Sequence, residues 1–202
     1  NLVKAVTQSF RTIPGVLGDK ELADIFAGKW CEERSTRIIQ TQAQRIYRLD
    51  KVNDVPAAPG KMRAATMAEK ALVIGWMHAF NIDCFGPNKN VPESDPTPGI
   101  EKGWIFFWET DGKPVSMAAK SRPTDKGMTV SYVYTPPEVR GKGYATSCVA
   151  ELSRNILQSG KEFCTLYTDL ANPTSNAIYK RIGYKEVTDS VEYTFYLPEE
   201  SI

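Results

Sequence analysis

Apolar positions along the chain follow a helical period in some stretches and the short alternating runs of strands in others. The clearest helical stripe lies in residues 144–159, where Ala145, Cys148, Val149, Leu152 and Ile156 recur at intervals of three and four. From residue 61 onward the pattern predicts strand 62–65, helix 67–80, a hairpin of 104–109 and 114–120, strand 128–134, helix 144–159, strand 163–170, helix 173–182, and strands near 184–187 and 192–197. This order predicts an α/β (α+β) fold with a mixed, mostly antiparallel sheet and one βαβ crossover in its middle.

The first 60 residues predict a smaller α/β extension. Residues 1–18 contain Pro14, Gly15 and Gly18 and are expected to be irregular. Asp19 is a plausible N-cap for a helix that ends near 31–34, and a strand is expected near 41–52. The Pro/Ala/Gly stretch at 55–60 is typical of a linker, so we expect domains at 1–60 and 61–202. The proline-rich segment 86–99 is predicted to be a flexible loop.

Composition excludes several classes of function. The chain is 42% hydrophobic and 24% charged, as in a globular protein, and its net charge of +1 makes nucleic acid a poor partner. Neither a membrane span nor a secretory leader is expected. One histidine and scattered cysteines do not predict a metal site. The four cysteines include no CxxC pair, which favours reduced thiols and a cytoplasmic location; they are Cys31, Cys84, Cys148 and Cys164.

The segment with the strongest chemical signal follows the strand that ends at Tyr134. Pro136 and Pro137 stop that strand, and a glycine-rich turn with two basic residues, Arg140-Gly141-Lys142-Gly143, then enters a helix directly. The first N–H groups of a helix have no intrahelical partner, and glycines let a phosphate approach the backbone closely. The turn therefore predicts an anion site, although six residues alone also fit a plain strand–turn–helix connection.

Two common phosphate motifs do not fit this turn. A P-loop needs Ser or Thr after its lysine, but Gly143 follows Lys142, and the dinucleotide pattern GxGxxG needs a glycine where Thr146 stands.

Two longer patterns resemble the GNAT superfamily of acetyl-CoA-dependent N-acetyltransferases. Arg140-x-x-Gly143-x-Ala145 resembles its [QR]-x-x-G-x-[GA] pyrophosphate loop, and Val133-Tyr134-Thr135-Pro136-Pro137-Glu138 resembles the lead-in. About forty residues later, Asn172 to Tyr179 with Gly183-Tyr184 resembles the family's N-x-x-(S/A)-x-x-x-Y-x-x-x-G-(F/Y) segment. The resemblance covers residues 61–197 and implies a GNAT fold whose two central parallel strands splay apart at the coenzyme site.

The resemblance also implies roles for individual residues. The pantetheine arm would pair with the backbone of Val133, Tyr134 and Thr135, much as an added strand would. Asn172 would bond the coenzyme arm or cap the next helix, Asn176 would lie near the adenosine side or face solvent, and Tyr179 would protonate the departing thiolate, although a core tyrosine is the plainer alternative. The pyrophosphate loop would comprise Arg140, Gly141, Lys142, Gly143, Tyr144, Ala145 and Thr146.

The implied reaction is direct attack of a neutral primary amine, of a small molecule or a peptide, on the thioester of acetyl-CoA. Cys148 and Cys164 are expected in the core rather than as nucleophiles, and no metal is implied. The general base is not assigned, and its candidates are Glu138, Asp169, Glu109 and a water held by Tyr134 and Tyr167. A homodimer is one expectation for the assembly. Alternative functions are a non-catalytic CoA-binding regulator, a nucleotide-binding protein and an interaction module without a small ligand.

Residues 11–52 resemble the same unit faintly, with Ile13 to Gly18 preceding a helix and a strand. One hypothesis is therefore that the extension is a degenerate second GNAT-like half, whose first strands are absent from this chain. An extension of unrelated origin is the alternative.

Overall fold

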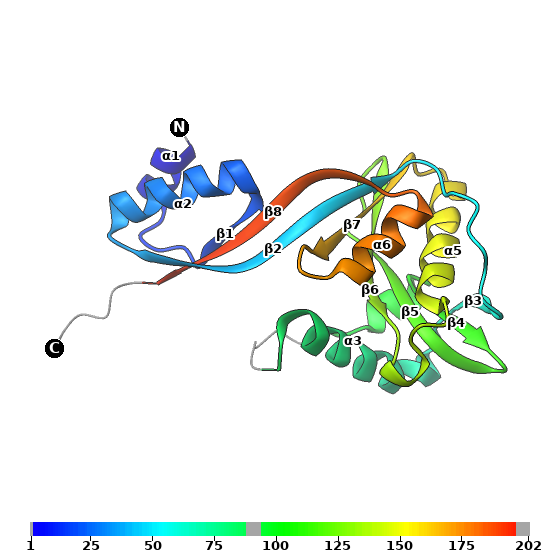
Figure 1. Cartoon of the computed structure of the whole chain (residues 1–202). Helices are drawn as coiled ribbons and strands as arrows, with labels where there is room; N and C mark the ends of the chain where they lie inside the picture. Colours follow the sequence, from blue (N-terminus) through cyan, green and yellow to red (C-terminus); the bar gives the residue numbers. More distant parts are fainter. Residues whose placement is uncertain (1, 88–93, 197–202) are drawn as a thin grey trace. The chain divides into compact units, whose positions relative to one another are not determined.

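The computed structural model describes residues 2–87 and 94–196, which form two compact units. The smaller unit comprises residues 1–46, 167–172 and 186–202, and the larger comprises 47–166 and 173–185. Each unit is built from separated parts of the sequence (Figure 1). The two units interleave along the chain, and each takes residues from both of the expected domains, 1–60 and 61–202. The division into these domains stays a prediction.

The strands hydrogen-bond in the order β1-β8-β2-β7-β6-β5-β4-β3. The β1–β8, β3–β4, β4–β5 and β5–β6 pairs are antiparallel, and β6–β7 is parallel. The strands are β1 (Gly15–Asp19), β2 (Arg37–Leu49), β3 (Lys61–Ala64), β4 (Ile105–Thr110), β5 (Lys113–Ser121), β6 (Gly127–Tyr134), β7 (Phe163–Asp169) and β8 (Lys185–Tyr196). The prediction of a mixed, mostly antiparallel sheet is confirmed.

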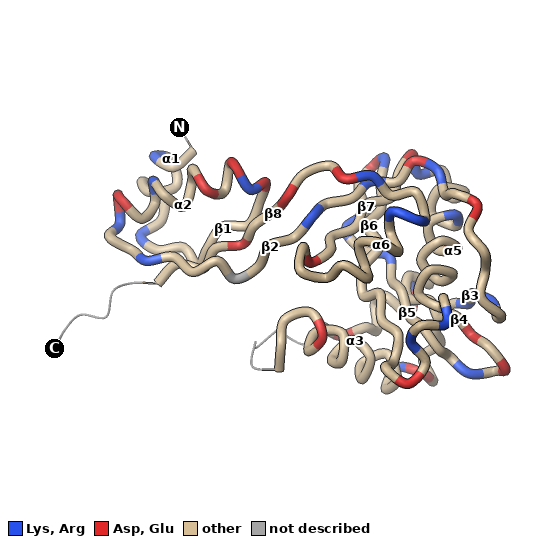
Figure 2. The backbone as a smooth tube through the Cα atoms, viewed as in Figure 1, with Lys and Arg blue, Asp and Glu red and all other residues tan. Residues whose placement is uncertain are grey.

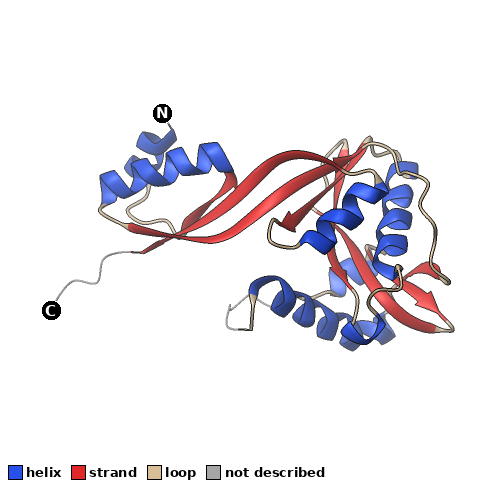
Figure 3. Ribbon diagram, viewed as in Figure 1, coloured by secondary structure: helices blue, strands red, loops and turns tan. Residues whose placement is uncertain are grey.

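Helices of the larger unit cover both faces of its strands (Figure 3). These helices are η1 (Met67–Glu69), α3 (Lys70–Phe85), α4 (Thr97–Glu101), η2 (Pro137–Val139), α5 (Tyr144–Gln158) and α6 (Pro173–Ile182). Side chains alternate along β4, so Phe106 and Trp108 join the core under α5 and α6, whereas Ile105 and Phe107 join the core under α3. Helix α5 connects the parallel strands β6 and β7, which is the expected βαβ unit.

The smaller unit holds α1 (Leu2–Ser9) and α2 (Lys20–Arg34), with α2 lying on the strands. Trp30 and Ala27 of α2 are buried against Phe195 of β8, and the Trp30 and Phe195 ring centroids are 5.9 Å apart. Asp19 caps α2 as predicted, because its carboxylate accepts a hydrogen bond from the Leu22 N–H at 3.2 Å.

Three sequence predictions about the elements were wrong. Residues 1–18 are not irregular, since they contain α1 and most of β1. The two predicted final strands are one continuous strand, β8. The strand expected at 41–52 is β2, which starts earlier, at Arg37.

The proline-rich segment differs in part from the loop that was predicted there. Residues 97–101 form α4. Asp95, just before this helix, accepts hydrogen bonds from the N–H and hydroxyl of Thr97 and forms an ion pair with Lys70 at 3.0 Å. Residues 88–93 of the predicted loop lie outside the described residues.

Acidic and basic residues are interspersed along the backbone of both units (Figure 2). In the described part of the chain, no helix combines the length and the apolar character needed to cross a membrane.

Candidate active site

A bulge near the end of β6 distorts the strand where the coenzyme was predicted to bind. Ala119 of β5 pairs with Ser131 and Met117 pairs with Tyr134, so β6 has one residue more than β5 over this stretch. Tyr132 within it adopts φ +49°, a left-handed conformation that bulky residues rarely take. Bulges release backbone groups from the ladder and are common beside active sites. No sequence signal predicts this bulge, since it contains no glycine.

Strand β6 also parts from its parallel neighbour before the bulge. The last recorded β6–β7 pair is Thr129 with Thr165, whose hydroxyl oxygens are 2.9 Å apart, whereas β6 continues to Tyr134. No further pair of β6 with β7 is recorded among the described residues, which agrees with the splay that the resemblance implies.

The glycine-rich turn after β6 adopts a conformation that suits an anion. Gly141 and Gly143 have φ of +80° and +81°, and a Cβ added at Gly141 would meet no atom within 4 Å. Gly143 is the N-cap of α5 and supplies no side chain to the first-turn N–H groups. Lys142 is exposed and has no recorded ion-pair partner among the described residues. Open space, helix-start N–H groups that no side chain caps in the described residues, and an exposed cation together fit a pyrophosphate.

Arg140 has a different role from the one expected of its charge. Its Nε donates to the Thr135 carbonyl at 2.8 Å, its Nη2 pairs with Asp83 of α3 at 2.5 Å, and its guanidinium lies over the Tyr134 ring. Arg140 thus fastens the start of the turn to the end of β6 and to α3, while Asp83 offsets its charge.

The end of β6 is held from the β5 side as well. Ser116 donates to the Tyr134 carbonyl at 3.1 Å, and its hydroxyl lies 2.9 Å from that of Thr135. The backbone predicted to meet pantetheine, at Val133, Tyr134 and Thr135, is therefore held in place by neighbouring side chains.

Tyr179 lies on α6 and is 7% exposed. Its ring contacts those of Tyr47 and Tyr184, with centroids 6.4 and 6.0 Å away. Burial raises the pKa of the Tyr179 phenol, and nearby Cys84 adds to the rise, so the group stays protonated at neutral pH. No hydrogen bond of its hydroxyl is recorded within the described ranges, which leaves the proton available for donation.

The two asparagines of the predicted site lie in different units. Asn176 accepts a hydrogen bond from the buried Tyr47 hydroxyl at 2.9 Å, which gives it a structural role in the larger unit. Asn172 is exposed and belongs to the smaller unit. The larger unit therefore contains the β6 end, the turn, Asn176 and Tyr179, but not Asn172.

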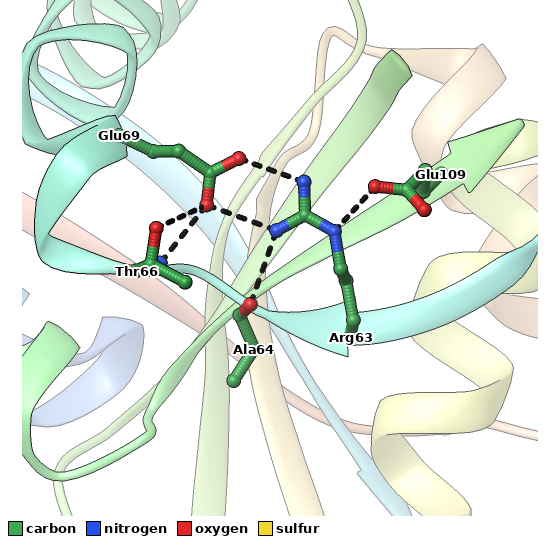
Figure 4. A network of polar contacts seen from close by, with 5 residues as sticks. All are labelled: Arg63, Ala64, Thr66, Glu69 and Glu109. Atoms are coloured by element: carbon green, nitrogen blue, oxygen red, sulfur yellow. Dashed lines mark hydrogen bonds and ion pairs between the residues drawn. The ribbon is translucent and has the colours of Figure 1, made fainter. Parts of the chain in front are cut away.

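Glu109, one of the candidate bases, is engaged elsewhere. Figure 4 shows Arg63 of β3 between Glu69 and Glu109, with ion pairs to both carboxylates. The Arg63 hydrogen bonds lower the pKa of Glu69 to about 2, and Glu69 also accepts from the N–H and hydroxyl of Thr66. This network fixes the start of α3, and it holds the Glu109 carboxylate in an ion pair with Arg63.

Ser131 was missed by the sequence reasoning. Its Oγ is buried and has no hydrogen-bond partner within the described part of the chain. Ser131 pairs with Ala119, a member of the core under α3, so its side chain lies on the α3 face of the sheet beside the bulge. A buried hydroxyl needs a hydrogen-bond partner, and a water or a polar group of a ligand beside the bulge would supply one.

Cys148 and Cys164 are fully buried, as predicted. Burial raises the pKa of both thiols to about 12, which makes them unreactive at neutral pH. No cluster of metal ligands occurs among the residues that the structure describes.

Comparison with known proteins supports one fold. The family model described as "FR47-like protein" matches residues 110–193, a range that includes the bulge, the turn and Tyr179. A GNAT-family acetyltransferase from Colwellia psychrerythraea shares 16% identity and superposes with a TM-score of 0.63 over 91% of this chain and 66% of its own. The chain has the GNAT fold.

Two further solved structures are similar to this chain. A GCN5-related N-acetyltransferase from Kribbella flavida has 18% identity and a TM-score of 0.59, covering 86% of this chain and 65% of its own. A Drosophila protein has 15% identity and a TM-score of 0.65, covering 91% of this chain and 61% of its own. This chain thus spans only 61–66% of the length of these three structures. No curated protein matches the sequence.

Proposed function

We propose that the larger unit transfers an acetyl group from acetyl-CoA to a primary amine, as an acyltransferase that forms no acyl-enzyme. The observation that carries the proposal is the Arg140–Thr146 turn, with its two left-handed glycines and uncapped helix start, directly after the bulged end of β6. The GNAT fold supports the same reading.

Different residues of the site would bind different parts of acetyl-CoA. The N–H groups of Gly141 to Thr146 and the Lys142 ammonium would hold the pyrophosphate. The freed side of β6 at Val133–Thr135 would take the pantetheine arm, and the bulge would turn an N–H toward the thioester oxygen as negative charge develops there. Acetyl-CoA supplies the activated acetyl group.

Tyr179 would assist the leaving thiolate. Because burial raises its pKa, the phenol is a weaker acid than a thiol, whose ordinary pKa is about 8.5. A hydrogen bond that stabilises the developing thiolate is therefore favoured over complete proton transfer.

The acceptor amine would enter on the α3 face of β6. Here the Ser131 hydroxyl, buried and without a partner among the described residues, lies beside the bulge, and Phe80 packs on Tyr132 with ring centroids 5.3 Å apart. Glu109 is bound to Arg63, so the candidates that remain for taking the amine proton are Glu138, Asp169 and a water held by Tyr134 and Tyr167. The free thiols fit the expected reducing, cytoplasmic compartment.

The experiment is a melting curve with and without acetyl-CoA, followed by an assay of thiol release with a panel of small and peptide amines. A ligand that binds only the folded state raises the melting temperature. A rise with acetyl-CoA and CoA, but not with ATP or NAD, and release that depends on the amine would support the proposal. Binding without turnover on any amine would favour a CoA-binding regulator, and no shift at millimolar acetyl-CoA would overturn the coenzyme site.

A further inference from the structure

The segment Lys51–Gly60 has the composition of a linker, but its contacts are those of a fixed part of the larger unit. We call it the strap. It leaves β2, passes the end of α6 and the start of α5, and enters β3. Its Val55 is 8% exposed and belongs to the core under α5 and α6. A flexible linker would make few such contacts.

The strap first binds the C-terminal end of α6. The Asn53 N–H donates to the Ile182 carbonyl at 2.8 Å, and its Nδ2 donates to the Arg181 carbonyl at 3.1 Å. Carbonyls at a helix end lack intrahelical partners, so these bonds cap α6. Helix α6 carries Tyr179.

The strap next reaches the start of α5, beside the glycine-rich turn. The Ala58 N–H donates to Ser147 Oγ at 2.8 Å, and Ser147 Oγ in turn donates to the Gly143 carbonyl at 3.2 Å. Ser147 is 3% exposed. One hydroxyl therefore joins the strap to the peptide of the left-handed glycine that opens the helix.

The last anchor lies on β4. Trp108 Nε1 donates to the Pro59 carbonyl at 3.0 Å. Gly60 has φ +123°, and a Cβ there would lie 2.3 Å from the Glu109 carbonyl oxygen, so only glycine allows this approach. Pro56 and Pro59 further restrict the strap.

We infer that the strap is a positioning element of the coenzyme site, with Ser147 as the residue through which it holds the pyrophosphate turn. This inference rests on the proposed function, because it assigns the turn to the coenzyme. The Gly143 peptide sets the direction of the following N–H groups. The Ser147 hydroxyl restrains that peptide together with the Ser147 N–H, which donates to the same carbonyl at 3.0 Å. Loss of the hydroxyl lets the turn sample other conformations and lowers the affinity for CoA.

The test compares Ser147→Ala with Ser153→Ala. Ser153 is a matched control, because it is a buried serine on the same helix, donates to the carbonyl four residues earlier at 2.7 Å, and bonds a second group, the Tyr184 hydroxyl, at 2.8 Å. Trp108→Phe removes the β4 anchor and keeps most of the ring. Calorimetric titration with CoA and urea unfolding without ligand are measured for each variant.

Ser147→Ala is expected to weaken CoA binding about 5- to 20-fold, the worth of one or two hydrogen bonds, and to raise the KM for acetyl-CoA while kcat stays within about twofold. Trp108→Phe should act in the same direction, and the double variant should lose less than the product of the two single losses, because both act through the strap. Ser153→Ala should lower stability comparably and leave CoA affinity unchanged.

Equal CoA affinity in Ser147→Ala and Ser153→Ala would overturn the inference and leave the coenzyme site intact. Failure of the unaltered protein to bind CoA would overturn both the inference and the proposed function.

Discussion

The Arg63 network in Figure 4 makes a quantitative prediction about pH and stability. Glu69→Gln removes the charge that Arg63 binds at 2.7 Å, while an amide oxygen remains for the Thr66 hydrogen bonds. The Glu69 pKa falls from 4.5 to about 2 in the folded chain, which corresponds to about 3 kcal/mol at ~1.36 kcal/mol per unit. The Glu69 side chain is 22% exposed, so solvent screening reduces the expected contribution to about 2 kcal/mol.

The sign follows from the lowered pKa. A carboxylate with a lower pKa in the folded state stabilises the fold above its unfolded pKa, and this stabilisation is lost as pH falls from about 4.5 toward 2. Urea unfolding should therefore show a deficit of about 2 kcal/mol for Glu69→Gln at pH 7 and about half of that near pH 3. Glu101→Gln, at an exposed glutamate, is the control. A deficit that stays constant from pH 7 to 3 would refute the ion-pair explanation.

Three substitutions probe the candidate site. Tyr179→Phe keeps the ring contacts with Tyr47 and Tyr184 and should lower kcat about 10- to 100-fold, the worth of a hydrogen bond to a charged group, with CoA affinity unchanged by calorimetry; an unchanged kcat would remove Tyr179 from the mechanism. Ser131→Ala should raise the KM of the acceptor amine about 5- to 20-fold in steady-state assays and leave the KM of acetyl-CoA alone, and the reverse pattern would contradict its place on the acceptor side. Lys142→Ala should weaken CoA binding about 5- to 10-fold at low salt and less at 0.5 M salt, because screening weakens an exposed charge contact; a difference that does not depend on salt would argue against direct charge pairing.

Sequence reasoning succeeded where a local pattern determines local structure. Helix α6 begins at Pro173 and ends at Ile182 as predicted, because Pro favours the first helical position and Gly183 stops the helix. The turn was also predictable, because two glycines before an amphipathic helix restrict the conformations of a short segment.

The polar break predicted in the last strand shows how tertiary partners override local signals. The predicted strands near 184–187 and 192–197 left Thr188, Asp189 and Ser190 between them. In the smaller unit Asp189 binds Arg45 at 2.7 Å, Thr188 donates to Asp19 at 2.7 Å, and Ser190 donates to the Gly18 carbonyl at 2.9 Å. Because these polar groups are satisfied by residues distant in sequence, the strand continues as β8.

The strap and the bulge were missed for a related reason. The Ala58–Ser147 bond joins residues 89 positions apart, so composition alone suggested a linker. The bulge arises from the register between β5 and β6, and Tyr132 carries no sequence signal for a positive φ.

Calorimetric titration of the unaltered protein and of Gly141→Ala is the sharpest test of whether acetyl-CoA binds at the Arg140–Thr146 turn. Alanine at this left-handed position costs about 1–2 kcal/mol, although nothing within 4 Å obstructs its Cβ. We expect saturable binding of acetyl-CoA to the unaltered protein, and affinity reduced about 5- to 30-fold in Gly141→Ala as the turn relaxes away from the phosphate. Equal affinity in the two proteins, or no binding by either, would contradict it.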